Sequence, residues 1–487
     1  MFCPQNMMGV RKREREMLFN SLQYAVFLPI VFALYWALPH RYRQPVLLIA
    51  SYYFYMSWNV KYVVLILFTT AVSYTAAVLL ERTDRTGKRK LLLAATLVAC
   101  LGVLFLFKYF NFFMGSLAAA AQRFAIPLHP TTLKLLLPVG ISFYTFQTLS
   151  YVIDVYRGDV TAEKNFFTYA LFVSFFPQLV AGPIERTKNL LPQLKAEHTF
   201  DYDQAMYGLK LMAWGYFKKA FADHLASYID GIYANISGAT RFDLIAAAIF
   251  FSIQIYCDFS GYSDIARGTA KLLGIDLMEN FKSPYFSSGI REFWSRWHIS
   301  LSTWFRDYVY IPLGGNRCSK LRHYANLLIT FLVSGLWHGA NWTFVVWGGL
   351  HGLGQIAEDA FGGRIPAKGK IARMTSIILV FLFCSIAWVF FRAESFETVG
   401  QFFRSVGASN PYTNLSNHDL GIRKLFPFFS GILLVAAFDC AALKRDVILW
   451  ISKRSLILRW GVLLILVWLI WFYFPASENA EFVYFQF

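Results

Sequence analysis

The sequence predicts an all-α integral membrane protein with many helices in one domain. Of its 487 residues, 57% are hydrophobic and 15% are charged, whereas soluble domains carry about 25% charged residues. Apolar runs long enough to cross a bilayer recur along most of the chain. Aromatic residues make up 18% of the sequence, a proportion that suits interfacial belts and lipid-facing surfaces.

Residues 1–16 form a basic segment ahead of the first apolar run. Arg11, Lys12 and Arg13 favour a cytoplasmic start for that run, whereas counting back from the basic cluster at 82–90 places its start outside. A biological start at Met17 removes this conflict. We therefore expect residues 1–16 to be an N-terminal extension and residues 17–487 to form a single transmembrane domain, because no stretch is long enough for a separate soluble domain.

Taken in order, the clear apolar runs predict spanning helices at 22–38, 61–80, 91–110, 242–259, 324–337, 341–357, 371–391, 425–443 and 456–474. Weaker runs, interrupted by polar residues, lie at 45–58, 132–156, 166–182 and 205–230. Together they predict about 11 to 13 membrane elements, with re-entrant segments where polar residues interrupt a run.

The net charge of +17 is distributed as short basic clusters between the apolar runs. These clusters lie at 82–90, 317–322, 364–373 and 444–454. The positive-inside rule explains such clusters as cytoplasmic loops, so we expect no nucleic-acid partner. The six cysteines are scattered and show no metal-binding spacing, so we expect no metal site.

Residues 291–317 predict one amphipathic helix that is too polar to span lipid alone. Its polar side collects Arg291, Ser295, Arg296, His298, Ser302, Thr303, Arg306 and Asp307. One interpretation is an interfacial helix whose polar side is only solvated. The other is that this side lines a funnel, in which Arg296 and Arg306 meet the phosphates of a nucleotide-like donor and His298 transfers a proton.

Residues 322–352 place a histidine deep in the bilayer. His338 follows the basic residue Arg322 by 16 positions, or about 24 Å along a helix. It could be a packing residue, but Gly335, Gly339 and Ala340 are small neighbours that we expect to leave room for a substrate. Trp337 and Asn341 offer hydrogen-bonding groups. A neutral imidazole there could act as general base. His351 is a weaker candidate.

Two blocks, FWSRWHISLSTWFRDYVYIPLGGNR at 293–317 and SGLWHGANWTFVVWGGLHG at 334–352, resemble the signature blocks of the membrane-bound O-acyltransferase family. The resemblance implies a helical domain around a central tunnel, with His338 as the catalytic histidine and His298 as the second motif histidine. It also implies acetyl-CoA or a related acyl thioester as the cytoplasmic donor, with no bound cofactor.

The same resemblance implies a bacterial inner-membrane location and outward partners. These are a periplasmic acetyltransferase or acetyl-carrier protein, and an exopolysaccharide acceptor. Asn341 or a backbone N–H of the tunnel is a candidate for stabilising the oxyanion that develops during acyl transfer. Three alternatives remain open: D-alanyl or other small-acyl transfer to a cell-wall polymer, a polytopic transporter or flippase, and a noncatalytic scaffold for polymer secretion.

Overall fold

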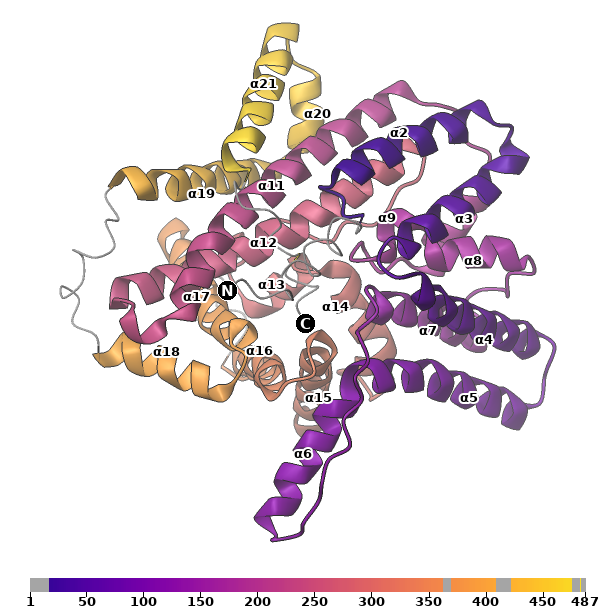
Figure 1. Ribbon diagram of the computed structural model, residues 1–487, viewed down its shortest axis with the longest axis horizontal. Coiled ribbons are helices and arrows are strands. Elements are labelled where there is room, and N and C mark those ends of the chain that lie inside the picture. The colour runs from indigo at the N-terminus through magenta and orange to yellow at the C-terminus, as the bar shows by residue number, and fades with distance from the viewer. Residues whose placement is uncertain (1–16, 362–368, 409–421, 475–481, 483–487) are drawn as a thin grey trace, which may run out of the picture. The chain divides into compact units, whose positions relative to one another are not determined.

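The computed structural model describes residues 17–361, 369–408, 422–474 and 482, and these residues form helices and no strands (Figure 1). The predicted N-terminal extension, residues 1–16, lies outside the described residues. The chain divides into two compact units, Met1–Leu209 with Ile265–Met278, and Lys210–Asp264 with Glu279–Phe487. Each unit is therefore built from segments that are distant in the sequence.

The first unit contains the helices of the N-terminal part. They are α2 (Leu22–Ala37), α3 (His40–Met56), η1 (Val60–Tyr62), α4 (Val63–Glu81), α5 (Thr86–Leu104), η2 (Phe105–Tyr109), α6 (Phe110–Arg123), α7 (Ile141–Arg157), α8 (Phe166–Ser174), α9 (Phe176–Leu179) and α10 (Thr187–Lys195). Two long helices, α11 (Tyr202–Ala234) and α12 (Arg241–Leu272), contribute residues to both units.

The second unit contains the remaining helices. They are η3 (Ile236–Gly238), η4 (Pro284–Phe286), α13 (Ile290–Arg296), α14 (Ile299–Phe305), η5 (Arg306–Tyr310), α15 (Lys320–His338), α16 (Trp342–Ala360), α17 (Lys370–Arg392), α18 (Phe396–Ala408), α19 (Ile422–Ala442), α20 (Val447–Ser452) and α21 (Leu456–Tyr473). Both sequence blocks that carry the candidate residues belong to this unit.

Five helices among the described residues are long and apolar enough to cross a membrane. They are Val60–Glu81, Thr86–Arg123, Arg241–Leu272, Lys370–Arg392 and Leu456–Tyr473. Shorter apolar helices occur at Leu22–Ala37 and Phe426–Ala442. The polytopic all-α fold is thus confirmed, while the larger count of about 11 to 13 membrane elements and the central tunnel stay predictions.

The weaker runs differ most from the structure. The run at 132–156 becomes helical only from Ile141, after Gly140 adopts a φ of 75° that favours glycine. The run at 166–182 splits between α8 and α9 at Phe175. Hydropathy locates the apolar segments, but it does not locate these backbone breaks.

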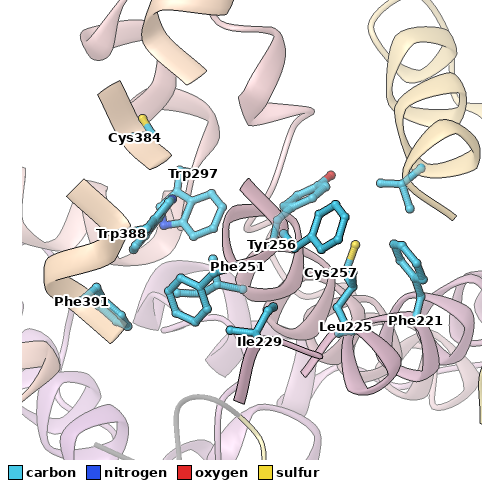
Figure 2. Packing of buried hydrophobic residues seen from close by; sticks show 14 of the residues in the cluster. Phe221, Leu225, Ile229, Phe251, Tyr256, Cys257, Trp297, Cys384, Trp388 and Phe391 are labelled. Atoms are coloured by element: carbon cyan, nitrogen blue, oxygen red, sulfur yellow. The ribbon is translucent and has the colours of Figure 1, made fainter. Parts of the chain in front are cut away.

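Aromatic side chains dominate the hydrophobic core of the second unit. Figure 2 shows Trp297, Trp388 and Phe391 on one side of this core and Phe221 with Leu225 on another. The ring centroids of Trp297 and Trp388 lie 5.1 Å apart, and those of Trp388 and Phe391 lie 5.2 Å apart. These contacts join the loop before α14 to α17, and so they fix the position of the residue that follows Trp297.

The same unit buries charged side chains on α11 and α12. The Lys219 ammonium lies 2.6 Å from a carboxylate oxygen of Asp223 and 2.8 Å from one of Asp258. Lys218 pairs with Asp264 at 2.7 Å. Charges are buried at an acceptable cost only when they are paired in this way, so both lysines are satisfied within the unit.

Candidate active site

The predicted amphipathic helix at 291–317 is wrong as a single helix, because the chain breaks at His298. There the backbone has a φ of 43°, in the left-handed region that non-glycine residues rarely adopt. Asn280 holds the break: its carbonyl accepts from the amide of Ile299 at 3.0 Å, and its side-chain oxygen accepts from the amide of Ser300 at 3.0 Å. The break turns His298 away from the predicted polar side, and its side chain is 0% exposed.

His338 is the last residue of α15 and is 5% exposed. Gly339 follows in an extended conformation, and α16 begins at Trp342. A cation is favourable at a helix C-terminus, so an imidazole that gains a proton there is stabilised by the helix dipole. The helix end thus suits a residue that takes up a proton during a reaction.

The fold brings the two histidines together. The ring centroids of His298 and His338 lie 6.4 Å apart, although the residues are 40 positions apart in the sequence. Trp337 lies beside both, with centroid distances of 5.0 Å to His338 and 6.2 Å to His298. Burial lowers the pKa of His298 to about 3, so this imidazole is neutral at physiological pH.

Aromatic rings enclose the pair. Trp347 and Phe391 meet the His338 ring edge-on, with centroid distances of 5.0 Å and 5.4 Å. Phe259 meets the His298 ring at 4.6 Å. An environment of this kind excludes water and strengthens any hydrogen bond made to the imidazoles.

The expectation that small neighbours leave room for a substrate beside His338 is wrong. A Cβ atom on Gly335 would lie 2.2 Å from the carbonyl oxygen of Phe344, and one on Gly339 would lie 2.2 Å from the Phe344 ring. The space beside these glycines is therefore filled by α16. They permit the close packing of two helices, as small residues commonly do in membrane proteins.

A cavity of about 720 Å³ lies in the same unit and receives much of the predicted polar side. Its lining includes Ser302 and Arg306, as the funnel interpretation predicts. Arg296 is not part of the lining, and its guanidinium instead donates to Glu292 at 2.6 Å. The break at His298 rotates the second half of the segment relative to the first, which separates Arg296 from Arg306.

A polar network that sequence patterns do not predict also lines the cavity. Arg291 donates to Asp359 at 3.0 Å, and a ring nitrogen of His323 lies 3.9 Å from the other oxygen of Asp359. The Tyr310 hydroxyl lies 2.9 Å from the second ring nitrogen of His323. Arg291 is on the predicted polar side, but His323 and Asp359 lie on other helices and carried no sequence signal.

Asn341 has a structural task. Its side-chain oxygen caps α16 by accepting from the amide of Thr343 at 3.2 Å, and its amide donates to the carbonyl of Glu394 at 2.6 Å. Capping of this kind stabilises a helix start by about 1 kcal/mol. The bond to Glu394 engages one of the two N–H donors of this amide, so Asn341 as the oxyanion stabiliser stays a prediction.

His351, the weaker candidate, lies fully buried on α16. Its Nδ1 accepts a hydrogen bond from Nε1 of Trp294 at 3.3 Å, and its ring stacks on Phe293 with an interplanar angle of 7°. Trp347 separates it from His338, with centroid distances of 5.1 Å and 5.0 Å. His351 therefore contacts the wall of the histidine pair and not the pair itself.

Comparison with known proteins identifies the family of the chain. The sequence model of MBOAT, the membrane-bound O-acyltransferase family, matches residues 161–396, which include both histidines. The chain is 42% identical over 400 residues to a protein of Azotobacter vinelandii named "Probable alginate O-acetylase AlgI", an alignment that covers 82% of this chain and 79% of that protein.

Two further relatives agree. The protein of the same name from Pseudomonas aeruginosa is 41% identical over 395 residues, which is 80% of this chain and 75% of that protein. The peptidoglycan O-acetyltransferase of Helicobacter pylori is 35% identical over 416 residues, which is 78% of each. The chain therefore belongs to the membrane-bound O-acyltransferase family and is a multi-pass membrane O-acetyltransferase.

Proposed function

We propose that this enzyme takes an acetyl group from acetyl-CoA, or a related acyl thioester, on the cytoplasmic side and supplies it for O-acetylation of an exopolysaccharide such as alginate. The observation that carries this proposal is the buried pair of His298 and His338, 6.4 Å apart, in the unit that also contains the polar cavity. The names of the relatives from A. vinelandii and P. aeruginosa support alginate as the polymer.

In the proposed reaction, His338 is the general base. It takes the proton of the acceptor hydroxyl while the hydroxyl oxygen bonds to the acetyl carbon, the C–S bond breaks, and the thiolate leaves and receives that proton. A thioester is reactive enough that the protein needs to supply only a base and hydrogen-bond donors. His298, whose ring is neutral and has its centroid 6.4 Å from that of His338, orients the acceptor hydroxyl for this proton transfer.

The cavity is the proposed binding site of the acyl donor. Ser302 and Arg306 lie in its wall with Arg291 and with His323, so two guanidinium groups and an imidazole line the space that phosphates would occupy. Arg306 currently pairs with its neighbour Asp307 at 2.7 Å, an exposed contact that a phosphate could replace at little cost. Trp337 packs beside both histidines and shapes the acetyl site. No donor contact is proposed for Arg296.

The proposed location is the bacterial inner membrane, because a thioester donor is cytoplasmic and an exported polymer lies outside. The outward partner is a periplasmic acetyltransferase or an acetyl-carrier protein that completes transfer to the polysaccharide. Membrane lipid surrounds the spanning helices, whose exposed side chains are largely apolar. Pull-down of a periplasmic protein that contains its own acyl-transfer site would support this assignment.

D-alanyl transfer is the alternative that a specific observation favours. The teichoic acid D-alanyltransferase of Bacillus subtilis is 28% identical over 290 residues, which is 56% of this chain and 72% of that protein. The O-acetylases match more of the chain at higher identity, which favours acetyl transfer. Supplying radiolabelled acetyl-CoA or D-alanine to membranes, and finding which label enters the polymer, distinguishes the two.

Replacing His338 by alanine tests the function directly. Loss of a general base typically costs about 10²–10⁴-fold in rate, so the exported polymer should lose nearly all its acetyl esters while the variant still accumulates in the membrane. His224→Ala is the matched control, because His224 packs against Phe428 and Tyr473, outside the histidine pair.

Normal acetylation by His338→Ala would overturn the proposal. A variant with alanine at both His298 and His338 separates enzyme from scaffold, since a scaffold would still complement a deletion strain. Release of CoA from acetyl-CoA separates an acyltransferase from a transporter or flippase, neither of which cleaves the thioester.

A further inference from the structure

Four cavity-lining residues of α15 form a row that points toward His338. They are His323, Leu327, Thr330 and Ser334, spaced three or four positions apart and therefore on one face of the helix. His338 is the next member of this row, four positions beyond Ser334. A donor that follows this face from the cavity reaches the histidine pair.

α16 provides a second row that runs the opposite way. Asp359 and Gln355 line the cavity, and His351 and Trp347 continue the row at intervals of four residues. Trp347 then contacts His338 at a centroid distance of 5.0 Å. The two rows thus converge on the imidazole of His338. The cavity lies along the part of each row that is farther from His338.

The indole of Trp294 lies at the edge of the cavity. Trp294 lines the cavity, whereas Trp347, His298 and His338 do not. Its ring contacts Phe331 of the cavity wall at a centroid distance of 5.3 Å and Trp347 at 5.8 Å. Trp294 therefore contacts both the space that suits a donor and the aromatic wall of the histidine pair.

One hydrogen bond holds this indole. Nε1 of Trp294 donates to Nδ1 of His351 at 3.3 Å, beyond the usual range for such a bond and so easily exchanged. The acceptor is fixed, because the His351 ring is fully buried, stacks on Phe293 and meets Phe383 edge-on. The hydrogen bond also places the His351 proton on Nε2.

We propose that Trp294 is a gate between the donor cavity and the histidine pair, and that His351 is the positioning residue that holds it closed. The inference rests on the proposed function, because the gate separates the thioester from the site that consumes it. A donor arm that advances along α15 displaces the indole and breaks the bond to His351. Without a donor, the closed gate keeps cytoplasmic water from the histidines.

The gate matters because water can replace the acceptor hydroxyl. In that side reaction the water oxygen bonds to the acetyl carbon, the C–S bond breaks, the thiolate takes a proton, and free acetate and thiol are formed. Exclusion of water from a closed site suppresses such losses. A loosened gate should therefore raise acetate release relative to transfer.

The test uses two conservative variants in inside-out membrane vesicles whose lumen is loaded with the periplasmic fraction and the polysaccharide acceptor, and which are supplied with radiolabelled acetyl-CoA from outside. Trp294→Phe keeps a ring but removes the N–H, and His351→Phe keeps the stack on Phe293 but removes the acceptor. In both we expect the ratio of free acetate to polymer-bound acetate to rise by about tenfold over wild type. After subtraction of the acetate that membranes of a deletion strain release, the ratio does not depend on how much protein folds.

Trp214→Phe is the matched control. Trp214 is a buried tryptophan of the same unit that stacks on Phe217 and Phe438, and it does not line the cavity. Its variant should keep the wild-type ratio. An unchanged ratio in both gate variants, or an equal rise in Trp214→Phe, overturns the gate. Wild-type vesicles that transfer no acetyl group overturn the proposed function as well.

Discussion

At the scale of single residues, the conformation of His298 links the backbone to the proposed chemistry. A φ of 43° is costly for most side chains, but histidine, asparagine and aspartate adopt it more readily than others. The conformation turns the imidazole inward and ends α13 after Arg296. The position thus requires both a backbone that tolerates this conformation and a ring that reaches His338.

Two substitutions at this position separate backbone from chemistry. His298→Asn should fold, because asparagine tolerates the left-handed region, but it should lose most acetyl transfer, because its short side chain cannot reach across to His338. His298→Val should also reduce the amount of folded protein, since a β-branched residue is strained there. Thermal unfolding in detergent measures the effect on folding, and transfer of the acetyl group measures the effect on chemistry. Full activity in His298→Asn would show that the imidazole is dispensable.

The sequence predicted both histidines but not all of their neighbours. His298 and His338 were identified because each lies in a recognisable block, and the fold brings their rings together. One continuous helix would place Arg296 and Arg306 on the same side, but the break at His298, held by Asn280 18 positions before it, separates them. Contacts between segments this far apart leave no trace in local periodicity.

At the scale of elements, the hairpin of α15 and α16 carries the site, and close helix approach builds it. A Cβ atom on Gly348 would lie 2.1 Å from the carbonyl oxygen of Phe331, a backbone atom that cannot move aside. Hydropathy predicted both helices within a few residues of their ends. It could not predict that their glycines make room for a helix and not for a substrate.

Adjacent glycines provide a matched test of this packing. Gly348→Ala should separate the helices, lower the free energy of unfolding by about 1–3 kcal/mol or more, and reduce acetyl transfer by displacing Trp347 from His338. Gly349→Ala should have little effect, because its Cβ would lie an ordinary 3.4 Å from a Leu332 methyl group. Melting temperatures in detergent check the first effect. Equal stability of the two variants would contradict the packing argument.

At the scale of the whole molecule, composition and charge say more than any motif about the membrane environment and the orientation of the chain. The fraction of apolar residues requires a membrane, and helices satisfy every backbone hydrogen bond within a span. The distribution of lysine and arginine then predicts the orientation. Nothing in composition, however, predicts how the chain divides into units, because Ile265–Met278 joins the N-terminal unit through contacts distant in sequence.

The orientation predicts from which side the donor enters. Arg317, Lys320 and Arg322 form a basic cluster at the start of α15, directly before the cavity-lining His323. The end of the cavity at His323 should therefore face the cytoplasm. A cysteine at the exposed position Lys320, in a background without native cysteines, should resist a membrane-impermeant maleimide in spheroplasts and react after permeabilisation.

The far end of a different span provides the opposite result. The helix Thr86–Arg123 starts in the basic cluster at 82–90 and has 38 residues, so its length of about 57 Å exceeds the hydrocarbon thickness, and its end should emerge outside. Phe124→Cys, at an exposed position just beyond this helix, should therefore react in intact spheroplasts. Labelling of Lys320→Cys in intact spheroplasts would show that the orientation is opposite to the predicted one. The donor cavity would then face away from a cytoplasmic thioester.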